Sequence, residues 1–427
     1  MRGTFRHSRR GSALIVIALA VAACGGASGT SSSSSTITVR VGYIGPLTGS
    51  SAQLGTETQD AGQLAVDQLN AKGGITVNGT KIKIQMVSED EGDRTTDGAV
   101  AGAERLIDQD NVTAIVGGVN SSGILAYMPI IQKAQIPMID TVGKASTIPT
   151  TIVSKNMNYI WVANPVSASL AETHVAAWKS LVKPKKIYFL QINTDATHDL
   201  ESAFKNEMAK QGLVAETQSS YVEANVNDFG PYILKIKQFQ PDLIWVSLLG
   251  NPVYSFARQL AQSGYTSGYV LDGDGEYGSS KFLAQEGQDA NLAMVNAVTF
   301  PTSVTPLSMP FYDSYKAQFN ISPAAYYAVD EYDGMLAFFE AIRRSGGLNG
   351  DLKHDRKAVE TGLGKLTPSN PFVGVRSAKE YFLGVDQGHR EPVPLVITQI
   401  QNGHYAVVWP PDAAKSADGK FIDPRQR

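Results

Sequence analysis

The chain has 427 residues, of which 43% are hydrophobic and 18% charged, and its formal net charge is −3. These values describe a globular protein without the basic surface that nucleic acid requires, so we expect no nucleic-acid partner. Cys24 is the only cysteine, which excludes a disulfide within the chain.

The first 36 residues predict export and anchoring. Arginines in residues 2–10 precede an apolar run over 13–23, which is shorter than the ~20 residues that cross a bilayer, so we expect residues 1–23 to be a cleaved signal peptide. The pattern resembles bacterial lipoprotein signals, and this resemblance implies a lipid on Cys24. The alternative is a leader in which Cys24 is incidental. Residues 24–36 are rich in Ser, Gly and Thr and predict a flexible tether.

Strand and helix patterns alternate in the first half of the remaining chain. Alternating or continuous apolar runs predict strands, and apolar residues three and four apart predict helices. The expected strands are 39–44, 82–86, 112–116 and 136–139, with helices at 53–72, 99–107 and before the last strand. Repeated strand and helix of this kind predict a parallel sheet with helices on both faces.

The same alternation restarts after residue 161. We expect strands at 186–192, 214–222, 243–249, 269–271 and 294–300, and helices at 200–211, 232–239 and up to 263. The run 243–249 is almost wholly apolar and predicts a buried central strand, whereas 269–271 and 294–300 are expected at edges. Helices at 310–319 and 323–344 follow, and Asn402-Gly403 predicts a hairpin between 396–401 and 404–409.

An ordered set of motifs resembles the leucine/isoleucine/valine-binding proteins of ABC importers. The motifs are VGYIGPLTG at 41–49, AVDQLNAKGG at 65–74, Glu89-Asp90, VGG at 116–118 before Asn120-Ser121-Ser122, IPMI at 136–139, and the terminal hairpin. The resemblance covers about residues 38–410. It implies an α/β fold of the type I periplasmic-binding-protein class, with two doubly wound lobes joined by three crossovers and a ligand cleft between them.

The resemblance also implies the division into lobes. The first lobe is expected to comprise residues 37–160 and 300–364, and the second 161–299 and 365–412, with 413–427 as a C-terminal tail. In such sheets ligands bind at the carboxyl ends of the strands, where loops expose N–H groups and short polar side chains.

Candidate ligand contacts in the first lobe follow two strands. Asn120, Ser121 and Ser122 precede a helix and would offer donors to an anion, while the alternative is that a serine only caps that helix. The second loop holds Thr141 and Val142. It departs from the family's Thr-rich pattern and adds the positive charge of Lys144, which leaves the ligand undetermined.

The second lobe contributes an acid. By resemblance Asp274 would pair with a ligand ammonium, although Asp272 is an alternative, and residues 272–275 are also typical of a plain polar turn. Leu54, Leu249 and Thr197 stand where the family has pocket aromatics. Tyr327, or its neighbour Tyr326, matches an aromatic that lines the pocket, with packing in the core as the alternative.

No catalytic or cofactor site is expected. The six histidines form no zinc motif, no nucleophile elbow occurs, and a lone G-x-G-x-x-G pattern at 273–278 is insufficient for a dinucleotide site. We therefore expect a non-enzymatic, lipid-anchored monomer on the outer face of the bacterial cytoplasmic membrane, without cofactor or metal. It would bind a small solute such as an amino acid, amide or carboxylate and deliver it to an ABC permease and its ATPase. The alternative is a ligand-sensing lipoprotein that reports to a signalling partner.

Overall fold

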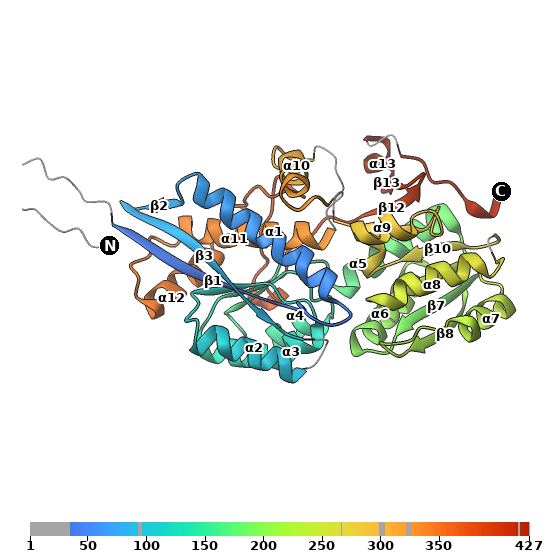
Figure 1. Cartoon of the computed structure of the whole chain (residues 1–427), viewed down its shortest axis with the longest axis horizontal. Coiled ribbons are helices and arrows are strands. Elements are labelled where there is room, and N and C mark those ends of the chain that lie inside the picture. Colours follow the sequence, from blue (N-terminus) through green and yellow to red (C-terminus); the bar gives the residue numbers. More distant parts are fainter. Residues whose placement is uncertain are drawn as a thin grey trace, which may run out of the picture. The chain divides into compact units, whose positions relative to one another are not determined.

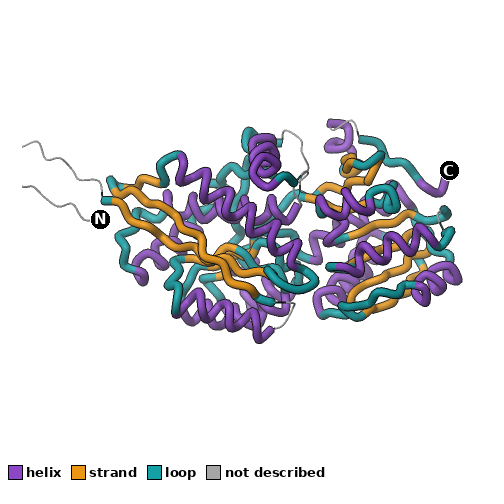
Figure 2. Tube along the Cα trace, in the orientation of Figure 1, coloured by secondary structure: helices purple, strands orange, loops and turns teal. Residues whose placement is uncertain are grey.

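The computed structural model describes residues 35–92, 96–265, 267–298, 304–321, 326–416 and 419–426. Strands and helices alternate along these residues and form two separate sheets, each flanked by helices (Figures 1 and 2). This is the predicted two-sheet, doubly wound α/β architecture. The predicted signal peptide and Cys24 lie outside the described residues.

The first sheet has six strands in the order β2-β3-β1-β4-β5-β6. All neighbours pair in parallel except β2, an antiparallel edge strand on β3. The strands are β1 (Thr36–Gly45), β2 (Ile75–Val77), β3 (Thr80–Asp90), β4 (Ala114–Val116), β5 (Met138–Asp140) and β6 (Ile160–Val162).

Helices cover both faces of this sheet because its strands carry apolar side chains on both sides. In β1, Val39 and Val41 belong to one core cluster and Ile44 to another. The first cluster includes α1 and α11, and the second includes α2 and α3 on the opposite face (Figure 1). The helices associated with this sheet are α1 (Ala52–Ala71), α2 (Thr96–Asp108), α3 (Ser121–Ala134), α4 (Thr147–Lys155), α10 (Ser308–Phe319), α11 (Tyr326–Arg344) and α12 (Leu352–Leu363).

The second sheet has seven strands in the order β13-β12-β11-β10-β9-β7-β8. In β7, Ile187 and Phe189 join a cluster with α5 and α6, whereas Tyr188 and Leu190 join one with α7 and α8. The strands are β7 (Lys186–Ile192), β8 (Glu216–Val222), β9 (Leu243–Ser247), β10 (Val270–Gly273), β11 (Met294–Ala297), β12 (Val396–Gln401) and β13 (His404–Trp409).

The helices of this half are shorter on average and include several single turns. They are α5 (Ser167–Ala177) with a π-helical extension (Trp178–Val182), α6 (Asp195–Gln211), α7 (Gly230–Phe239), α8 (Asn251–Gln262), α9 (Ser280–Glu286) and α13 (Pro411–Ser416). Three 3₁₀ turns cover Gly275–Gly278, Val385–Gln387 and Pro424–Gln426. No helix among the described residues is long and apolar enough to span a bilayer.

Each predicted strand corresponds to an observed one, with one correction of position, but β2 and β6 were not predicted. The strands expected at the edge, 269–271 and 294–300, correspond to β10 and β11, and both lie inside the sheet. The reason is the terminal hairpin, because β12 pairs antiparallel with β11 and β13 then forms the edge. The hairpin itself is confirmed, and Asn402 and Gly403 have the positive φ angles of 50° and 78° that such a turn needs.

The chain passes between the sheets three times: after β6, after β11 and before β12. The segment before the last crossing packs with the first sheet. Leu366, Phe372 and Phe382 belong to the core that includes α1 and α11, and Arg390 bridges to Val162 of β6. This corrects the part of the predicted second lobe, residues 365–412, that precedes β12. The segment contains no long helix or strand, so periodicity offered no signal; the exact lobe boundaries stay a prediction.

A fully buried ionic cluster ties this segment to the other crossings. The Arg376 guanidinium contacts Asp330 at 2.5 Å and Glu391 at 2.6 Å, and lies 3.6 Å from Asp333 and 3.5 Å from Glu380. It also donates to the carbonyl of Ala163, directly after β6, at 3.0 Å. The Arg376 guanidinium is thus the one cation that the described residues place among these four carboxyl groups.

Candidate ligand-binding site

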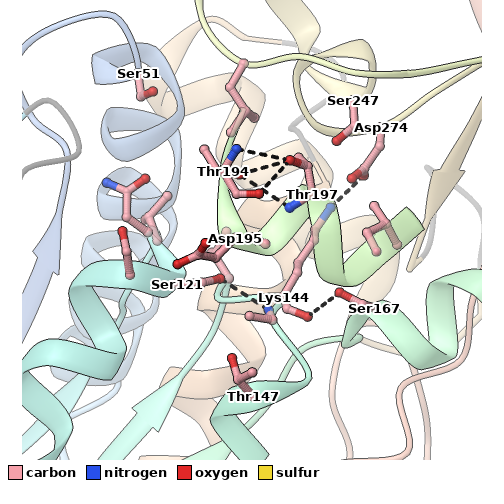
Figure 3. A pocket seen from close by; sticks show the side chains of 18 of the residues that line it. Ser51, Ser121, Lys144, Thr147, Ser167, Thr194, Asp195, Thr197, Ser247 and Asp274 are labelled. Carbon is pink, nitrogen blue, oxygen red and sulfur yellow. Dashed lines mark hydrogen bonds and ion pairs between the residues drawn. The ribbon is translucent and has the colours of Figure 1, made fainter. Parts of the chain in front are cut away.

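A cavity of about 200 Å³ lies at the carboxyl ends of strands from both sheets. Nine of the ten predicted ligand contacts line it, and Figure 3 shows three of them, Ser121, Thr197 and Asp274, from three different segments of the chain. The lining residues are Ser51, Leu54, Val119, Asn120, Ser121, Ser122, Leu125, Val142, Lys144, Ala145, Thr147, Ser167, Thr194, Asp195, Ala196, Thr197, Leu200, Ser247, Leu249, Asp274 and Tyr327.

The N-terminus of α3 forms one wall of the cavity. Asn120 is the N-cap residue, and the amide of Ile124 donates to its carbonyl at 3.0 Å, so the amides of Ser121, Ser122 and Gly123 begin the helix without a partner in its backbone ladder. These groups and the helix dipole favour an anion at this end.

The capping alternative for the serines is wrong. Asn120, not a serine, is the N-cap residue, and no side-chain capping bond is made. The Ser121 hydroxyl instead accepts from the amide of Ala145 at 3.2 Å, which links α3 to the loop after β5. Ser122 lines the cavity.

Asn120 is hydrogen-bonded to a buried acid. Its amide and its side-chain NH₂ both donate to Glu91 Oε1, at 3.2 and 2.7 Å. Burial raises the pKa of Glu91 to about 8, against the lowering effect of these two hydrogen bonds, so the carboxyl is largely protonated at neutral pH. Asn120 therefore lines the cavity while its donors face the protein.

The loop after β5 is folded on the Asp140 carboxylate. Asp140 Oδ1 accepts from the amides of Val142 (3.2 Å) and Gly143 (2.8 Å), a local turn typical of aspartate. Gly143 is packed so closely that a Cβ would lie 2.3 Å from Ile124 Cδ1. This turn directs Val142 and Lys144 to the cavity.

Thr141 is the predicted contact that the structure places elsewhere. Its side chain is fully buried and its hydroxyl donates to Glu331 Oε2 at 2.6 Å, and Thr141 is absent from the cavity lining. Val142 lines the cavity, whereas the Thr141 hydroxyl is bound to Glu331 of α11. The prediction that Thr141 contacts the solute is wrong for this reason.

Asp272 and Asp274 differ in their position relative to the end of β10. Asp272 lies within the strand, and its fully buried side chain accepts from His174 Nδ1 at 2.7 Å and from Trp178 Nε1 at 2.5 Å. Asp274, two residues on, lies past the end of the strand and lines the cavity. Asp272 therefore holds α5 to the sheet, and Asp274 is the acid available to the site.

Asp274 is paired with Lys144 from the first sheet. Lys144 Nζ lies 2.6 Å from Asp274 Oδ1 (Figure 3). It also donates to the Tyr327 hydroxyl at 2.7 Å, and its charge lies 4.7 Å from the centre of the Tyr327 ring. Burial would raise the pKa of Asp274, but the charge and hydrogen bond of Lys144 outweigh it and lower that pKa.

The lysine backbone is itself held in place. Ser167, the first residue of α5, donates to the Lys144 carbonyl from its amide at 2.8 Å and from its hydroxyl at 3.0 Å. The sequence analysis noted the charge of Lys144 but did not select it as a contact, because nothing in its position along the chain reveals the partner 130 residues away.

Apolar side chains and the start of α6 complete the walls. Leu54 and Leu249 line the cavity as expected, as does Tyr327, while the side chain of Tyr326 lies outside the described residues. Thr197 also lines it, but its hydroxyl donates to the Ile192 carbonyl at 2.5 Å, so Thr197 mainly shapes the turn.

The polar lining residues that the sequence analysis missed are Ser51, Thr147, Ser167, Thr194, Asp195 and Ser247. Thr194 and Asp195 follow β7, and Ser247 ends β9. The rule that ligands bind at strand carboxyl ends would have selected Thr194 and Asp195, since the strand 186–192 was predicted. Ser247 was missed because the predicted strand 243–249 extended two residues past it.

Comparison with known proteins identifies the family. The family model for periplasmic binding proteins matches residues 38–404. The chain belongs to the periplasmic binding protein family. The family match supports the prediction of a binding protein and not an enzyme. Among the described residues, no group of three or more His, Cys, Asp or Glu side chains is arranged to hold a metal ion.

Relatives of known sequence or structure align with nearly the whole chain. The Leu/Ile/Val-binding protein homolog 8 of Brucella abortus is 25% identical over 393 residues, which are 88% of this chain and 91% of that protein. The branched-chain amino acid transporter substrate-binding protein LivJ of Streptococcus pneumoniae, in complex with isoleucine, has a TM-score of 0.74 at 21% identity and covers 88% of this chain and 100% of its own. An ABC transporter solute-binding protein of R. palustris in complex with benzoate has a TM-score of 0.72 at 17% identity, with coverages of 87% and 95%. These structures share the type I fold.

Proposed function

We propose that this protein is the solute-binding lipoprotein of an ABC importer, which captures a small polar solute between its two lobes and delivers it to the permease. The observation that carries the proposal is the cavity, whose walls combine the α3 N-terminus from the first sheet with Asp274 from the second. A solute that contacts both walls stabilises the arrangement in which they face each other, which is the basis of hinge closure. Similarity to proteins solved with isoleucine and with benzoate supports this proposal.

The solute's carboxylate or amide oxygen would lie at the start of α3. The amides and hydroxyls of Ser121 and Ser122 are donors there, and the helix dipole adds to an anion's affinity. The apolar part of the solute would contact Leu54, Leu125 and Leu249. These assignments are part of the proposal.

The proposal is tested by thermal unfolding of the purified soluble domain across a panel of amino acids, amides, short-chain acids and aromatic acids. A solute present at 100 times its Kd should add about 2.7 kcal/mol to the free energy of unfolding. Absence of stabilisation by every member of the panel would reject the proposal.

The binding site is tested by the double variant Ser121→Ala, Ser122→Ala. We expect a carboxylate from the panel to bind at least tenfold more weakly, which is about 1.4 kcal/mol, in isothermal calorimetry. The matched control is Ser154→Ala, Ser202→Ala, which removes two exposed hydroxyls from α4 and α6 and should leave Kd unchanged. Equal Kd values for both double variants would remove the serines from the site.

The anchor is tested at Cys24, which lies outside the described residues. Cys24→Ala should still bind solute but leave the membrane fraction of cells that express the full chain, because the lipid holds the protein at the membrane. Retention of the variant in the membrane fraction would contradict lipidation at this residue.

A further inference from the structure

The carboxylate that the cavity offers to a solute is already neutralised by the chain itself. Asp274 has 6% of its side chain exposed and Lys144 14%, and their 2.6 Å contact joins loops from different sheets. Lys144 also donates to Tyr327 and stands over its ring, so a hydroxyl and an aromatic face complete the surroundings of the ammonium. A carboxylate, a hydroxyl and an aromatic face are the groups with which a protein binds an ammonium ion.

A solute ammonium at Asp274 would have to displace this lysine. The displaced Nζ would lose Asp274 and Tyr327 while its backbone remains held by Ser167. Removing one partner from a largely buried ion pair leaves an uncompensated charge, which strongly opposes the exchange.

The other charged lining residue does not replace Asp274. Among the described residues that line the cavity, the charged ones are Lys144, Asp195 and Asp274. Asp195 is exposed in the first turn of α6. There it complements the helix dipole, and an ion pair with a solute would be hydrated and weak.

We infer that the solute carries no ammonium group, and that this protein takes a small carboxylic acid or amide with an apolar body in preference to an amino acid. Lys144 supplies from within the chain the cation that an amino acid would bring. This inference rests on the proposed capture function and names the chemical class of its solute.

The decisive measurement uses pairs of solutes that differ only in the amine. Calorimetry at pH 7 compares L-leucine with 4-methylpentanoate and L-phenylalanine with 3-phenylpropanoate on the wild-type protein. We expect the acid without an amine to bind at least tenfold more tightly than the matching amino acid in at least one pair, and neither amino acid to bind more tightly than its partner.

The outcomes separate the two proposals. An amino acid that binds as tightly as its partner, or more tightly, leaves the capture function standing and overturns the inference. If these four compounds and the amides and aromatic acids of the panel all fail to bind, the capture function is rejected and the inference falls with it.

A variant shows whether Lys144 causes the preference. Lys144→Met removes the cation at nearly constant shape, so the ratio of the two Kd values in a pair should move at least tenfold toward the amino acid. The double variant Lys144→Met, Asp274→Asn removes both charges, so its Kd ratio should not show this shift toward the amino acid. Lys210→Met, at a lysine with 69% of its side chain exposed, is the control that should keep the wild-type ratio.

An unchanged ratio in folded Lys144→Met would overturn the role of Lys144. Circular dichroism verifies folding of each variant. If Lys144→Met does not fold, the solute pairs are compared on the wild type and on the double variant, because neither protein contains an unpaired Asp274. This comparison still tests the role of the Lys144 charge.

Discussion

Two buried ionic groups of this protein differ in how cations and carboxylates are balanced. In the cavity one lysine faces one aspartate, Lys144 and Asp274. At the crossings between the sheets one arginine, Arg376, faces four carboxylates: Asp330, Asp333, Glu380 and Glu391. The first group faces a cavity, whereas the second is enclosed by protein.

This balance decides the direction of the pKa shifts. For Asp274, burial raises the pKa but Lys144 outweighs it, and the net shift is downward. In the cluster, burial dominates, since one guanidinium is shared among four acids. The pKa of Asp330 and of Glu380 is raised well above the usual range, and that of Glu391 to about 7. The pKa values of the enclosed acids are therefore shifted upward, whereas that of the cavity acid is shifted downward.

The largest effect is expected from Arg376→Met. The variant leaves four buried carboxylates without their cation, and loss of one partner of a buried ion pair costs about 3–5 kcal/mol. Urea unfolding should show this loss, and it should be larger at pH 8 than at pH 5, because the acids can take up protons at the lower pH.

Arg343→Met is the control for this prediction. Arg343 pairs with Glu340 at 2.5 Å, with 43% and 25% of the two side chains exposed, and Glu340 keeps Arg344 at 3.3 Å, so the removal should cost less than about 1 kcal/mol. Similar losses for the two variants would contradict a special role of the enclosed cluster.

A smaller effect is expected from Asp272→Ala, which separates a structural acid from the cavity acid two residues away. The variant leaves His174 and Trp178 without their buried acceptor, a loss of about 1–3 kcal/mol in the free energy of unfolding. Its affinity for a solute from the panel should equal that of the wild type. A weaker affinity in calorimetry, at a temperature where the variant is fully folded, would mean that Asp272 also serves the site.

The smallest effect per pH unit concerns Glu331, a buried acid of α11 that accepts a hydrogen bond from Thr141 and forms no ion pair with the residues that the structure describes. Burial raises its pKa from 4.5 to about 8. Between these values the folded state binds more protons than the unfolded state, so the free energy of unfolding falls as pH rises, by at most about 1.4 kcal/mol per pH unit for this group.

Glu331→Gln should flatten this dependence. Urea unfolding at pH 5, 6.5 and 8 compares the slope of the variant with that of the wild type. Asp274 has the opposite sign, since its lowered pKa gives stability that is present above its ordinary pKa of 3.8 and lost in stronger acid. An identical slope in Glu331→Gln would show that Glu331 is ionised in the folded protein.

The sequence predicted what depends on local periodicity. The buried run that became β9 and the Asn402-Gly403 hairpin were located, and the family resemblance selected Asp274 and Val142, which line the cavity. The prediction for Thr141 failed because the hydrophobic pattern does not show which side chain of a turn points into the cavity. The interior positions of β10 and β11 failed because they depend on a hairpin about a hundred residues later in the chain.

The ionic groups lay beyond sequence reasoning altogether. Lys144 and Asp274 are 130 positions apart, and Arg376 is 46 from Asp330. Their partners are set by how two sheets and three crossings are assembled, and neither hydrophobic spacing nor a motif in the chain carries that information.

The low exposure of Lys144 and Asp274 also bears on when their water is lost. With 14% and 6% of their side chains exposed, the two charges have given up most of their hydration in the arrangement described here. Their loops belong to different sheets, so under the proposed function each opening of the cleft would separate the charges and return them to water. Dehydration of an ion pair is costly, and every closure would include it whether or not the solute is charged. The contacts between the solute and the two walls would have to offset that cost in each capture cycle.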